Sequence, residues 1–198
     1  MNCPAYGGLA NPILVGGGAC EIRLSDSLEY LGSPLPTRQF SFQSLMNVYK
    51  NLQFSMLVDY RGGSRNYNNT REFRNNGGFA NGPDFWDIRA PLSDQVKSAA
   101  RAMGTSDGYI EDASFVRLSE VAMTWVVPAA AAKLLKSGGL SLTLAGRNLG
   151  LWSDYTGFDP EVLSTPGANA GNVGGFNTQD FLTNPQGRSY TLRVNFNF

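Results

Sequence analysis

Three carboxylates that stand close together, Asp154, Asp159 and Glu161, have the types and the spacing best suited to chemistry. Two neighbouring carboxylates can act as general acid and base in the hydrolysis of a glycosidic bond. The same oxygens can bind Ca²⁺, although their spacing is not that of an EF-hand loop. A third interpretation makes Asp159-Pro160 a turn and leaves the other two carboxylates in solvent. Because nothing in the sequence fixes their separation, we favour the turn.

The rest of the sequence lacks the partners that most catalytic sites require. None of the 198 residues is a histidine, which removes the commonest general base and the commonest metal ligand. A serine or cysteine nucleophile therefore has no histidine to activate it. No glycine-rich loop followed by Lys-Ser or Lys-Thr is present to hold a phosphate. We expect a protein that is not an enzyme and that uses no cofactor and no metal ion.

The two cysteines, Cys3 and Cys20, lie in a stretch rich in glycine and proline. A disulfide that closes one exposed loop is our expectation, and two free thiols are the alternative. Residues 1–36 show little regular periodicity, so we interpret them as a loop or a truncated remnant. Residues 37–198, in which the pattern begins, form the main domain.

The composition differs from that of an ordinary soluble domain. Charged residues make up 16% of the chain, against about 25% in typical soluble domains. The 16 Lys and Arg residues balance the 16 Asp and Glu residues, so the total charge gives no attraction for nucleic acid. Apolar runs are far shorter than the roughly 20 residues of a membrane-spanning helix. A membrane protein with this sequence would have to be a β-barrel.

Five segments alternate between apolar and polar residues, as amphipathic strands do. In the last of them Tyr190, Leu192, Val194, Phe196 and Phe198 alternate with polar residues, over a length close to the roughly 9–11 residues of a membrane-crossing strand. The other segments are residues 40–48, 52–61, 115–127 and 140–147. The pattern predicts an antiparallel, all-β protein.

Three local features connect these strands. Lys50-Asn51 predicts a tight turn that makes a hairpin of the first two. The apolar phase of the third strand changes midway, which predicts a β-bulge near Ser119-Glu120 that restores one apolar face. Short helices are predicted over residues 92–103 and 129–135, where apolar residues recur at helical spacing or follow a proline.

The connections alternate in length, short after the first and third strands and long after the second and fourth. Outer-membrane barrels show this asymmetry, with short periplasmic turns and long extracellular loops. This orientation puts Tyr49 and Trp125 at the periplasmic interface, with Tyr60 and Tyr190 at the outer one. It also turns one polar residue of each of four strands toward the lumen: Arg61, Arg117, Arg147 and Arg193.

The long loops carry aromatic residues that can contact a substrate or a partner. The candidates for such contacts are Trp86, Tyr155 and Phe158, with Asp159 beside them. The alternative is that loop aromatics pack together and hold the loops in place, and we favour it.

Five blocks follow one another along the chain: residues 30–36 (YLGSPLP), 59–63 (DYRGG), 111–118 (EDASFVRL), 146–149 (GRNL) and 155–161 (YTGFDPE). In order and spacing they resemble the end of the barrel of SusC/RagA-type TonB-dependent outer-membrane transporters. That family has an N-terminal TonB box, a plug and a barrel of about 22 strands. The resemblance therefore implies the last five strands of such a barrel, which cannot close or transport alone.

The resemblance also implies a function and partners. We expect part of an importer of oligosaccharides or peptides in a Gram-negative-type outer membrane, in contact with the lipid bilayer and with a SusD-like surface lipoprotein. The TonB complex would act only through the missing N-terminal part. The outer-membrane assembly machinery would read the C-terminal signal of Tyr190, Phe196 and Phe198. The alternative from another class is a soluble or surface-anchored β-sandwich that binds carbohydrate.

Overall fold

The computed structural model describes residues 27–75, 89–102, 104–134, 136–161 and 179–197. The chain divides into two compact units. The first, which we call the sheet unit, consists of residues 35–64, 113–155 and 184–198. The second, which we call the loop unit, consists of residues 1–34, 65–112 and 156–183. Each unit is described by itself.

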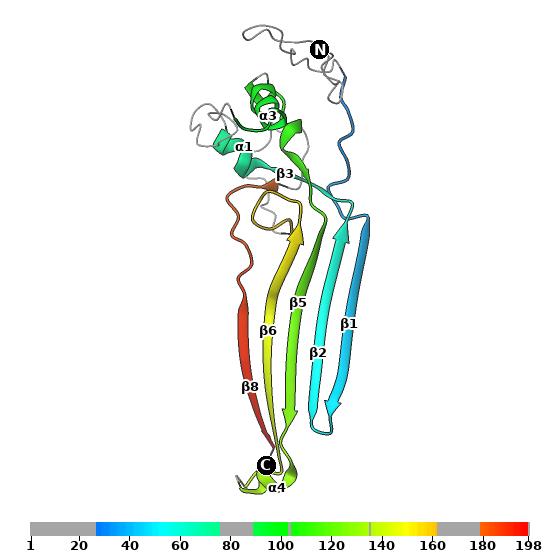
Figure 1. Ribbon diagram of the computed structural model, residues 1–198, viewed down its shortest axis with the longest axis vertical. Helices are drawn as coiled ribbons and strands as arrows, with labels where there is room; N and C mark the ends of the chain where they lie inside the picture. Colours follow the sequence, from blue (N-terminus) through cyan, green and yellow to red (C-terminus); the bar gives the residue numbers. More distant parts are fainter. Residues whose placement is uncertain (1–26, 76–88, 103, 135, 162–178, 198) are drawn as a thin grey trace. The chain divides into compact units, whose positions relative to one another are not determined.

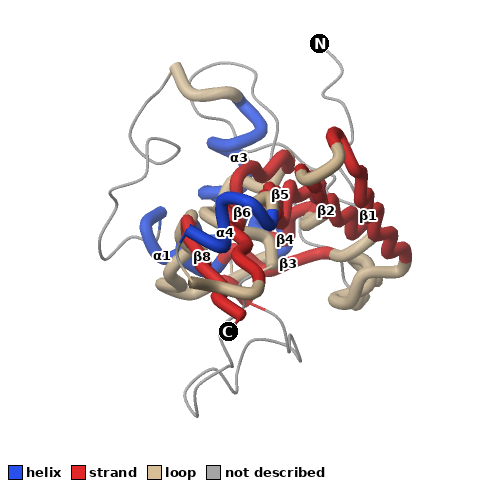
Figure 2. Tube along the Cα trace, turned by 90° about the horizontal axis from the view of Figure 1, so that it is seen from below, coloured by secondary structure: helices blue, strands red, loops and turns tan. Residues whose placement is uncertain are grey.

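The sheet unit is one antiparallel sheet of five strands in the order β1-β2-β5-β6-β8 (Figures 1 and 2). Its strands are β1 (Arg38–Tyr49), β2 (Leu52–Gly62), β5 (Phe115–Val126), β6 (Gly139–Ser153) and β8 (Ser189–Asn197). All five predicted strands are confirmed. The fourth is longer than predicted, because Gly150, Leu151 and Trp152 continue to pair with β5.

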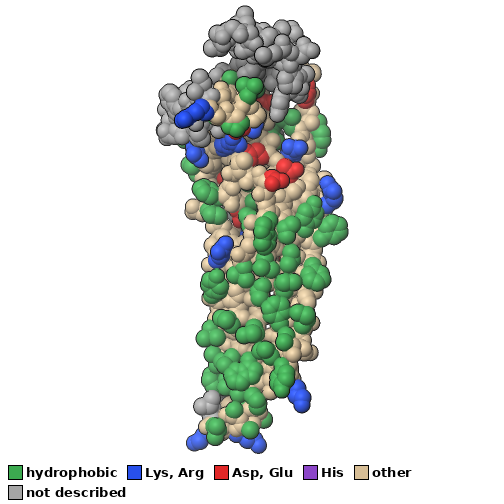
Figure 3. All heavy atoms as spheres, in the orientation of Figure 1, with side chains coloured by type: hydrophobic (Ala, Val, Ile, Leu, Met, Phe, Trp, Pro, Cys, Tyr) green, Lys and Arg blue, Asp and Glu red, His purple; other side chains and the backbone are tan. Residues whose placement is uncertain are grey.

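The pairing register separates the residues of the sheet into an apolar and a polar face, since paired residues on neighbouring strands share a face. Apolar and aromatic side chains cover one face (Figure 3). Row by row the register joins such residues, for example Phe42 with Val58 and Leu144 with Leu192. This face is exposed, with Phe42 at 60% and Leu192 at 68%. In a sandwich a second sheet would bury such side chains, so the structure disagrees with the soluble alternative.

The predicted β-bulge is confirmed at Ser119. On one side of β5, Leu57 pairs with Glu120 and Val58 with Leu118, so Ser119 has no partner in the ladder. The register toward β6 shifts at the same place. The extra residue returns Leu118 and Val121 to a common face, which is the reason for the phase change in the sequence.

The short connections lie at the other end of the strands from the long ones. Lys50-Asn51 forms the predicted turn between β1 and β2, and helix α4 (Ala129–Leu134) lies between β5 and β6. Residue 135, the predicted last residue of that helix, lies outside the described residues. After α4, the Ser137 hydroxyl donates to the Asn197 carbonyl at 2.8 Å, and the Gly138 amide donates to the same oxygen at 2.6 Å. The connection therefore anchors the end of β8.

The loop unit contains more regular structure than its sequence predicts. Its three-stranded sheet has the order β4-β3-β7, from β3 (Arg65–Asn68), β4 (Ile110–Asp112) and β7 (Gln179–Asp180). Beside it are α1 (Asn69–Asn75), α3 (Leu92–Ala102) and the short 3-10 helix η1 (Asp107–Tyr109). The helix α3 was predicted. The small sheet and α1 were not, because their sequences are short and polar. None of the helices in the described part of the chain is long and apolar enough to cross a membrane.

Candidate functional site

The four arginines expected in the lumen share the polar face of the sheet. The register pairs Arg61 with Gln39, Arg117 with Asp59, Arg147 with Glu120 and Arg193 with Thr143. On their other sides Arg147 pairs with Ser189, whereas Arg61 pairs with Phe115 and Arg117 with Leu151. The four arginines thus share the face that the alternation predicts, and some apolar residues stand among them. That this face lines a lumen remains a prediction.

Polar contacts cross this face near the bulge. Asp59 accepts hydrogen bonds from the hydroxyls of Ser41, at 2.6 Å, and of Ser119. Arg117 is 4% exposed, its guanidinium carbon lies 5.2 Å from the centre of the Phe115 ring, and it donates a hydrogen bond to Asn148 Oδ1 at 2.7 Å. These two contacts stabilise a charged side chain that is buried in the sheet unit. Our sequence analysis missed Asp59, which stands in the polar phase of β2, and Asn148. Asn148 continues the apolar phase of β6 and has a φ of 53°, so strand alternation does not predict its contact with Arg117.

An ion pair between Arg147 and Glu120 adds to the polar face, with 2.7 Å between Arg147 Nε and Glu120 Oε2. Both side chains are partly exposed, at 66% and 34%. An ion pair in such a position contributes little stability, because water screens it. The ion pair places one positive and one negative side chain next to the bulge.

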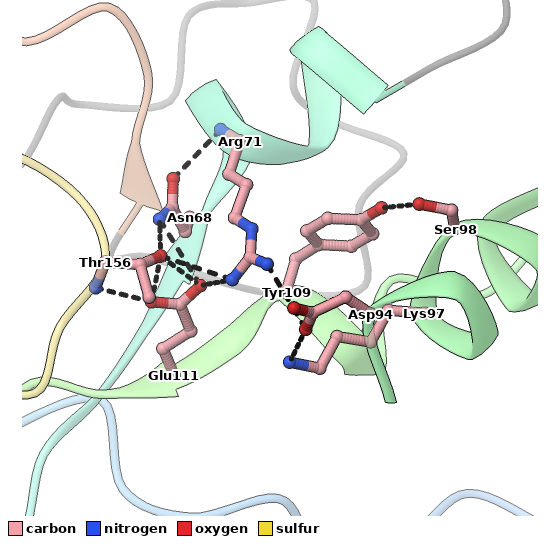
Figure 4. A network of polar contacts seen from close by, with 8 residues as sticks. All are labelled: Asn68, Arg71, Asp94, Lys97, Ser98, Tyr109, Glu111 and Thr156. Carbon is pink, nitrogen blue, oxygen red and sulfur yellow. Dashed lines mark hydrogen bonds and ion pairs between the residues drawn. The ribbon is translucent and has the colours of Figure 1, made fainter. Parts of the chain in front are cut away.

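The loop unit holds a polar network centred on Glu111 (Figure 4). This carboxylate accepts hydrogen bonds from Arg71 at 3.2 Å, from the Thr156 hydroxyl at 2.7 Å and from the Thr156 amide at 2.9 Å. Arg71 also pairs with Asp94 at 3.4 Å. The Arg71 amide in turn donates to Asn68 Oδ1 at 2.9 Å, so Asn68 caps the start of α1. The network thus joins α1, β4, α3 and the segment after β6.

The carboxyl of Asp94 is held in its charged form. Burial by itself raises its pKa, but the hydrogen bond and charge of Lys97 and the charge of Arg71 outweigh burial, so the pKa lies below its ordinary value. The Asp94 Oδ1 atom lies 3.0 Å from the Lys97 ammonium, one turn along α3.

A second cluster, which includes a buried ion pair, fixes α1 against α3. The Tyr67 hydroxyl donates to Glu72 Oε2 at 2.5 Å, and Arg101 pairs with the other oxygen of the same carboxylate. Tyr67 and Glu72 are 2% and 3% exposed. Burial, and then the hydrogen bond to Glu72, raises the pKa of Tyr67 above its ordinary value. The phenol therefore stays neutral and serves as a donor.

The loop unit also contains a pocket of about 310 Å³. It is lined by Asn68, Thr70, Arg71, Arg74, Asn75, Thr156, Gly157, Phe158 and Asp180. Phe158 is 69% exposed and presents its ring at the surface. Of the lining residues only Phe158 was among our candidates, since polar residues scattered over three segments leave no periodic signal.

The other contact candidates are placed differently. Tyr155 is 7% exposed and Asp159 is 2% exposed, as packing residues are, and Trp86 lies outside the described residues. Asp159 Oδ1 accepts a hydrogen bond from the Glu161 amide at 3.0 Å, which is the local geometry of a turn. In the described part of the chain, no group of three acidic or cysteine side chains is placed to hold a metal ion. Contact roles for these residues stay predictions.

The predicted C-terminal signal is described in part. Tyr190 and Phe196 lie on the apolar face of β8 and are 72% and 51% exposed. Phe198 lies outside the described residues, as do Cys3 and Cys20. The predicted disulfide and the terminal aromatic therefore stay predictions.

Comparisons with known proteins bear on this arrangement. No family model matches the chain. The TonB-dependent receptor P26 of Formosa agariphila is 32% identical to it over 209 aligned residues, which cover 96% of this chain and 20% of that protein. The chain thus spans about one fifth of the length of this curated relative.

Solved structures of the RagAB transporter have the same fold as this chain. The RagAB peptide importer in the closed-closed state matches it with a TM-score of 0.58 and 23% sequence identity, and the match covers 94% of this chain and 20% of the RagAB chain. The open-open state matches with a TM-score of 0.54 and 24% identity over 89% of this chain and 18% of that one.

The long amphipathic strands and the structural matches define the class of the chain, a segment of an antiparallel outer-membrane β-barrel. Similarity to the receptor extends over nearly its whole length. The chain belongs to the TonB-dependent receptors, and its fold is that of the corresponding part of the RagAB transporter.

Proposed function

We propose that the chain forms part of the barrel wall of an outer-membrane importer for oligosaccharides or peptides. The observation that carries this proposal is the separation of the five-stranded sheet into two faces. A barrel in a lipid bilayer needs an apolar outer face and tolerates polar side chains only on its inner face. The exposed apolar face meets lipid, and the face with Arg61, Arg117, Arg147 and Arg193 lines the lumen.

Two comparisons support transport rather than catalysis. The curated relative is named a TonB-dependent receptor, and the solved structures are named peptide importers or transporters. The chain covers only about a fifth of each, 20% of the receptor and 20% of the importer. Import is accordingly a property that we assign to the assembled protein, with this segment as a passive wall and not an enzyme.

We assign the partners in the same way. The structural neighbours are named RagAB peptide importer, and by analogy with them we infer a SusD-like surface lipoprotein as the partner here. Energy would come from the TonB complex acting on a part of the transporter that this sequence does not include. Tyr190, Phe196 and Phe198 would present the last strand to the outer-membrane assembly machinery, and the site of action is the outer membrane of a Gram-negative-type cell.

A matched pair of lysine substitutions in β8 tests the proposal. Leu192 lies on the apolar face opposite Leu144, and Thr191 lies on the polar face opposite Ala145. In the full-length transporter, Leu192→Lys should cost about 2–4 kcal/mol of folding free energy near the middle of the bilayer. Thr191→Lys should cost far less.

The measurement has two readouts, the amount of transporter in the outer membrane and the uptake of labelled oligosaccharides and peptides by the cells. We expect Leu192→Lys to lower both and Thr191→Lys to leave the amount in the membrane near the wild-type level. Equal amounts of the two lysine variants in the membrane would contradict the proposal that the chain forms part of a barrel wall. Recovery of the wild-type protein in soluble form without detergent would contradict it as well. A transporter that is normally assembled and imports neither class would contradict the cargo assignment.

A further inference from the structure

The pocket of the loop unit has a polar floor that hydrogen bonds hold in place. Thr70 Oγ1 donates to the Asp180 backbone carbonyl at 3.2 Å and accepts from the Leu182 amide at 2.8 Å. Asp180 is 1% exposed, and its carboxylate also accepts from the Thr183 hydroxyl at 2.5 Å. The floor is thus formed before any ligand binds, which lowers the entropy cost of binding.

The two arginines of the pocket differ in what they do. Arg71 is held by Glu111 and Asp94, and its side chain is 19% exposed. Arg74 follows three residues later, so both side chains leave the same side of α1. Arg74 is exposed, and within the described residues its guanidinium makes no hydrogen bond and no ion pair. A guanidinium in this state is available to a ligand and matches the geometry of a carboxylate.

The remaining lining defines the rest of the ligand. The Phe158 ring is 69% exposed and offers a flat apolar surface at the pocket. Asn68, Thr70 and Thr156 supply amide and hydroxyl groups. The volume of about 310 Å³ is near the lower end for ligand pockets, which start at roughly 300 Å³, and suits one ring rather than a folded chain. A sugar ring has an apolar C–H face that stacks on an aromatic ring and hydroxyls that bond to such polar groups.

Charge selects among sugars. The charge of Arg71 is already balanced by Glu111 and Asp94, and the carboxylate of Asp180 is buried among hydrogen-bond donors, so the guanidinium of Arg74 is the exposed charge of the lining and favours an anionic ligand. We propose that this pocket binds a carboxylate-bearing sugar unit of an oligosaccharide, with its carboxylate on Arg74 and its ring against Phe158. The inference rests on the proposed import function and names the cargo class that this site would accept.

Binding calorimetry on the full-length transporter in detergent micelles tests this assignment. The probes are a trimer of galacturonic acid, a neutral trimer of galactose and the peptide Glu-Glu-Glu. The acidic trisaccharide should bind at least about tenfold more tightly than the neutral one, since a charge-assisted bond to Arg74 is added. Added salt should weaken its binding.

Variants separate a binding role from a structural one. Arg74→Gln should weaken acidic trisaccharide binding about tenfold, and Arg74→Lys should restore part of it. Phe158→Ala should weaken binding of both trisaccharides. Arg188→Gln, at an exposed position of the sheet unit before β8, is the matched control and should change neither. Hydrogen exchange of α1 should be the same in all four variants.

Other outcomes would overturn the assignment. These are no binding by the wild-type transporter, equal binding of the two trisaccharides, binding of the peptide alone, or no effect of Arg74→Gln. Because calorimetry needs no transport, its result is independent of the lysine test. If cells take up the labelled cargo normally but the transporter binds no acidic trisaccharide, only this inference is refuted. If the protein binds the acidic trisaccharide but does not assemble in the outer membrane, only the proposed function is refuted.

Discussion

At the scale of single residues, the loop unit contains a buried carboxylate with a charged partner. Glu72 is 3% exposed, and the Tyr67 hydroxyl and Arg101 both contact its carboxylate. A buried carboxylate without such partners would be strongly unfavourable. These contacts, and not a large apolar core, hold α1 against α3.

Tyr67→Phe should therefore destabilise the loop unit. The substitution removes a donor from a buried carboxylate and should cost about 1–3 kcal/mol. Hydrogen exchange of the α1 and α3 amides measures this. Tyr109→Phe is the matched control, since that buried hydroxyl has only a 3.5 Å contact with Ser98 and should cost less. Equal losses in the two variants would contradict the role of the Tyr67–Glu72 bond.

Asp94 makes the stability of the loop unit depend on pH. Its pKa is lowered in the folded state, mainly by Lys97 and Arg71 acting against burial. Its contribution is therefore present above the unfolded pKa and is lost as pH falls through the lower folded pKa. We expect the protection of the α3 amides against hydrogen exchange, taken relative to the intrinsic exchange rate at each pH, to fall below about pH 4. Asp94→Asn should flatten this dependence, and Lys97→Met should move it to higher pH. If Asp94→Asn left the pH dependence of hydrogen exchange in α3 unchanged, Asp94 would not be its cause.

At the scale of elements, the sheet was largely predictable and the small sheet of the loop unit was not. The strands β1, β2, β5 and β8 alternate with period two, and even the bulge left a phase change in the sequence. The strands β3, β4 and β7 have two to four residues, too few for a period. Their positions are set by contacts between distant residues, such as Asn66 Nδ2 with the Pro160 carbonyl at 2.6 Å.

The same reasoning applies to the candidate site. Arg61, Arg117, Arg147 and Arg193 were found because strand phase alone places them on one face. Arg71, Arg74 and Asp180 come together only after the loop unit folds. No local pattern in the sequence predicts that pocket.

Two single-residue deletions test the bulge as an element. Without Ser119, Leu118 and Glu120 become neighbours and β5 alternates without a break, so Arg117 and Glu120 keep the polar face and Leu118 and Val121 keep the apolar face. Deleting Ala122 instead shifts the alternation on one side of that position and turns the side chains there to the wrong face. In full-length transporter, the Ser119 deletion variant should reach the outer membrane in far larger amounts than the Ala122 deletion variant, as measured by immunoblotting. Equally poor or equally good assembly of the two variants would contradict this role of Ser119.

At the scale of the whole molecule, the two units have different tasks in our account. The sheet unit has long strands, an exposed apolar face and a polar face, as a barrel wall requires. The loop unit carries the hydrogen-bonded network and the pocket. The central claim is that the two faces of the sheet unit meet different solvents, lipid on one side and water on the other.

Alternating cysteine accessibility in β8 tests that claim most directly. In full-length transporter with Cys3→Ser and Cys20→Ser, single cysteines would replace Thr191, Leu192, Arg193 and Val194 in turn, with labelling by a water-soluble maleimide in outer-membrane vesicles. We predict fast labelling at positions 191 and 193, slow labelling at positions 192 and 194, and equal labelling after detergent unfolding. Uniform labelling in intact vesicles, or the reverse alternation, would contradict the account.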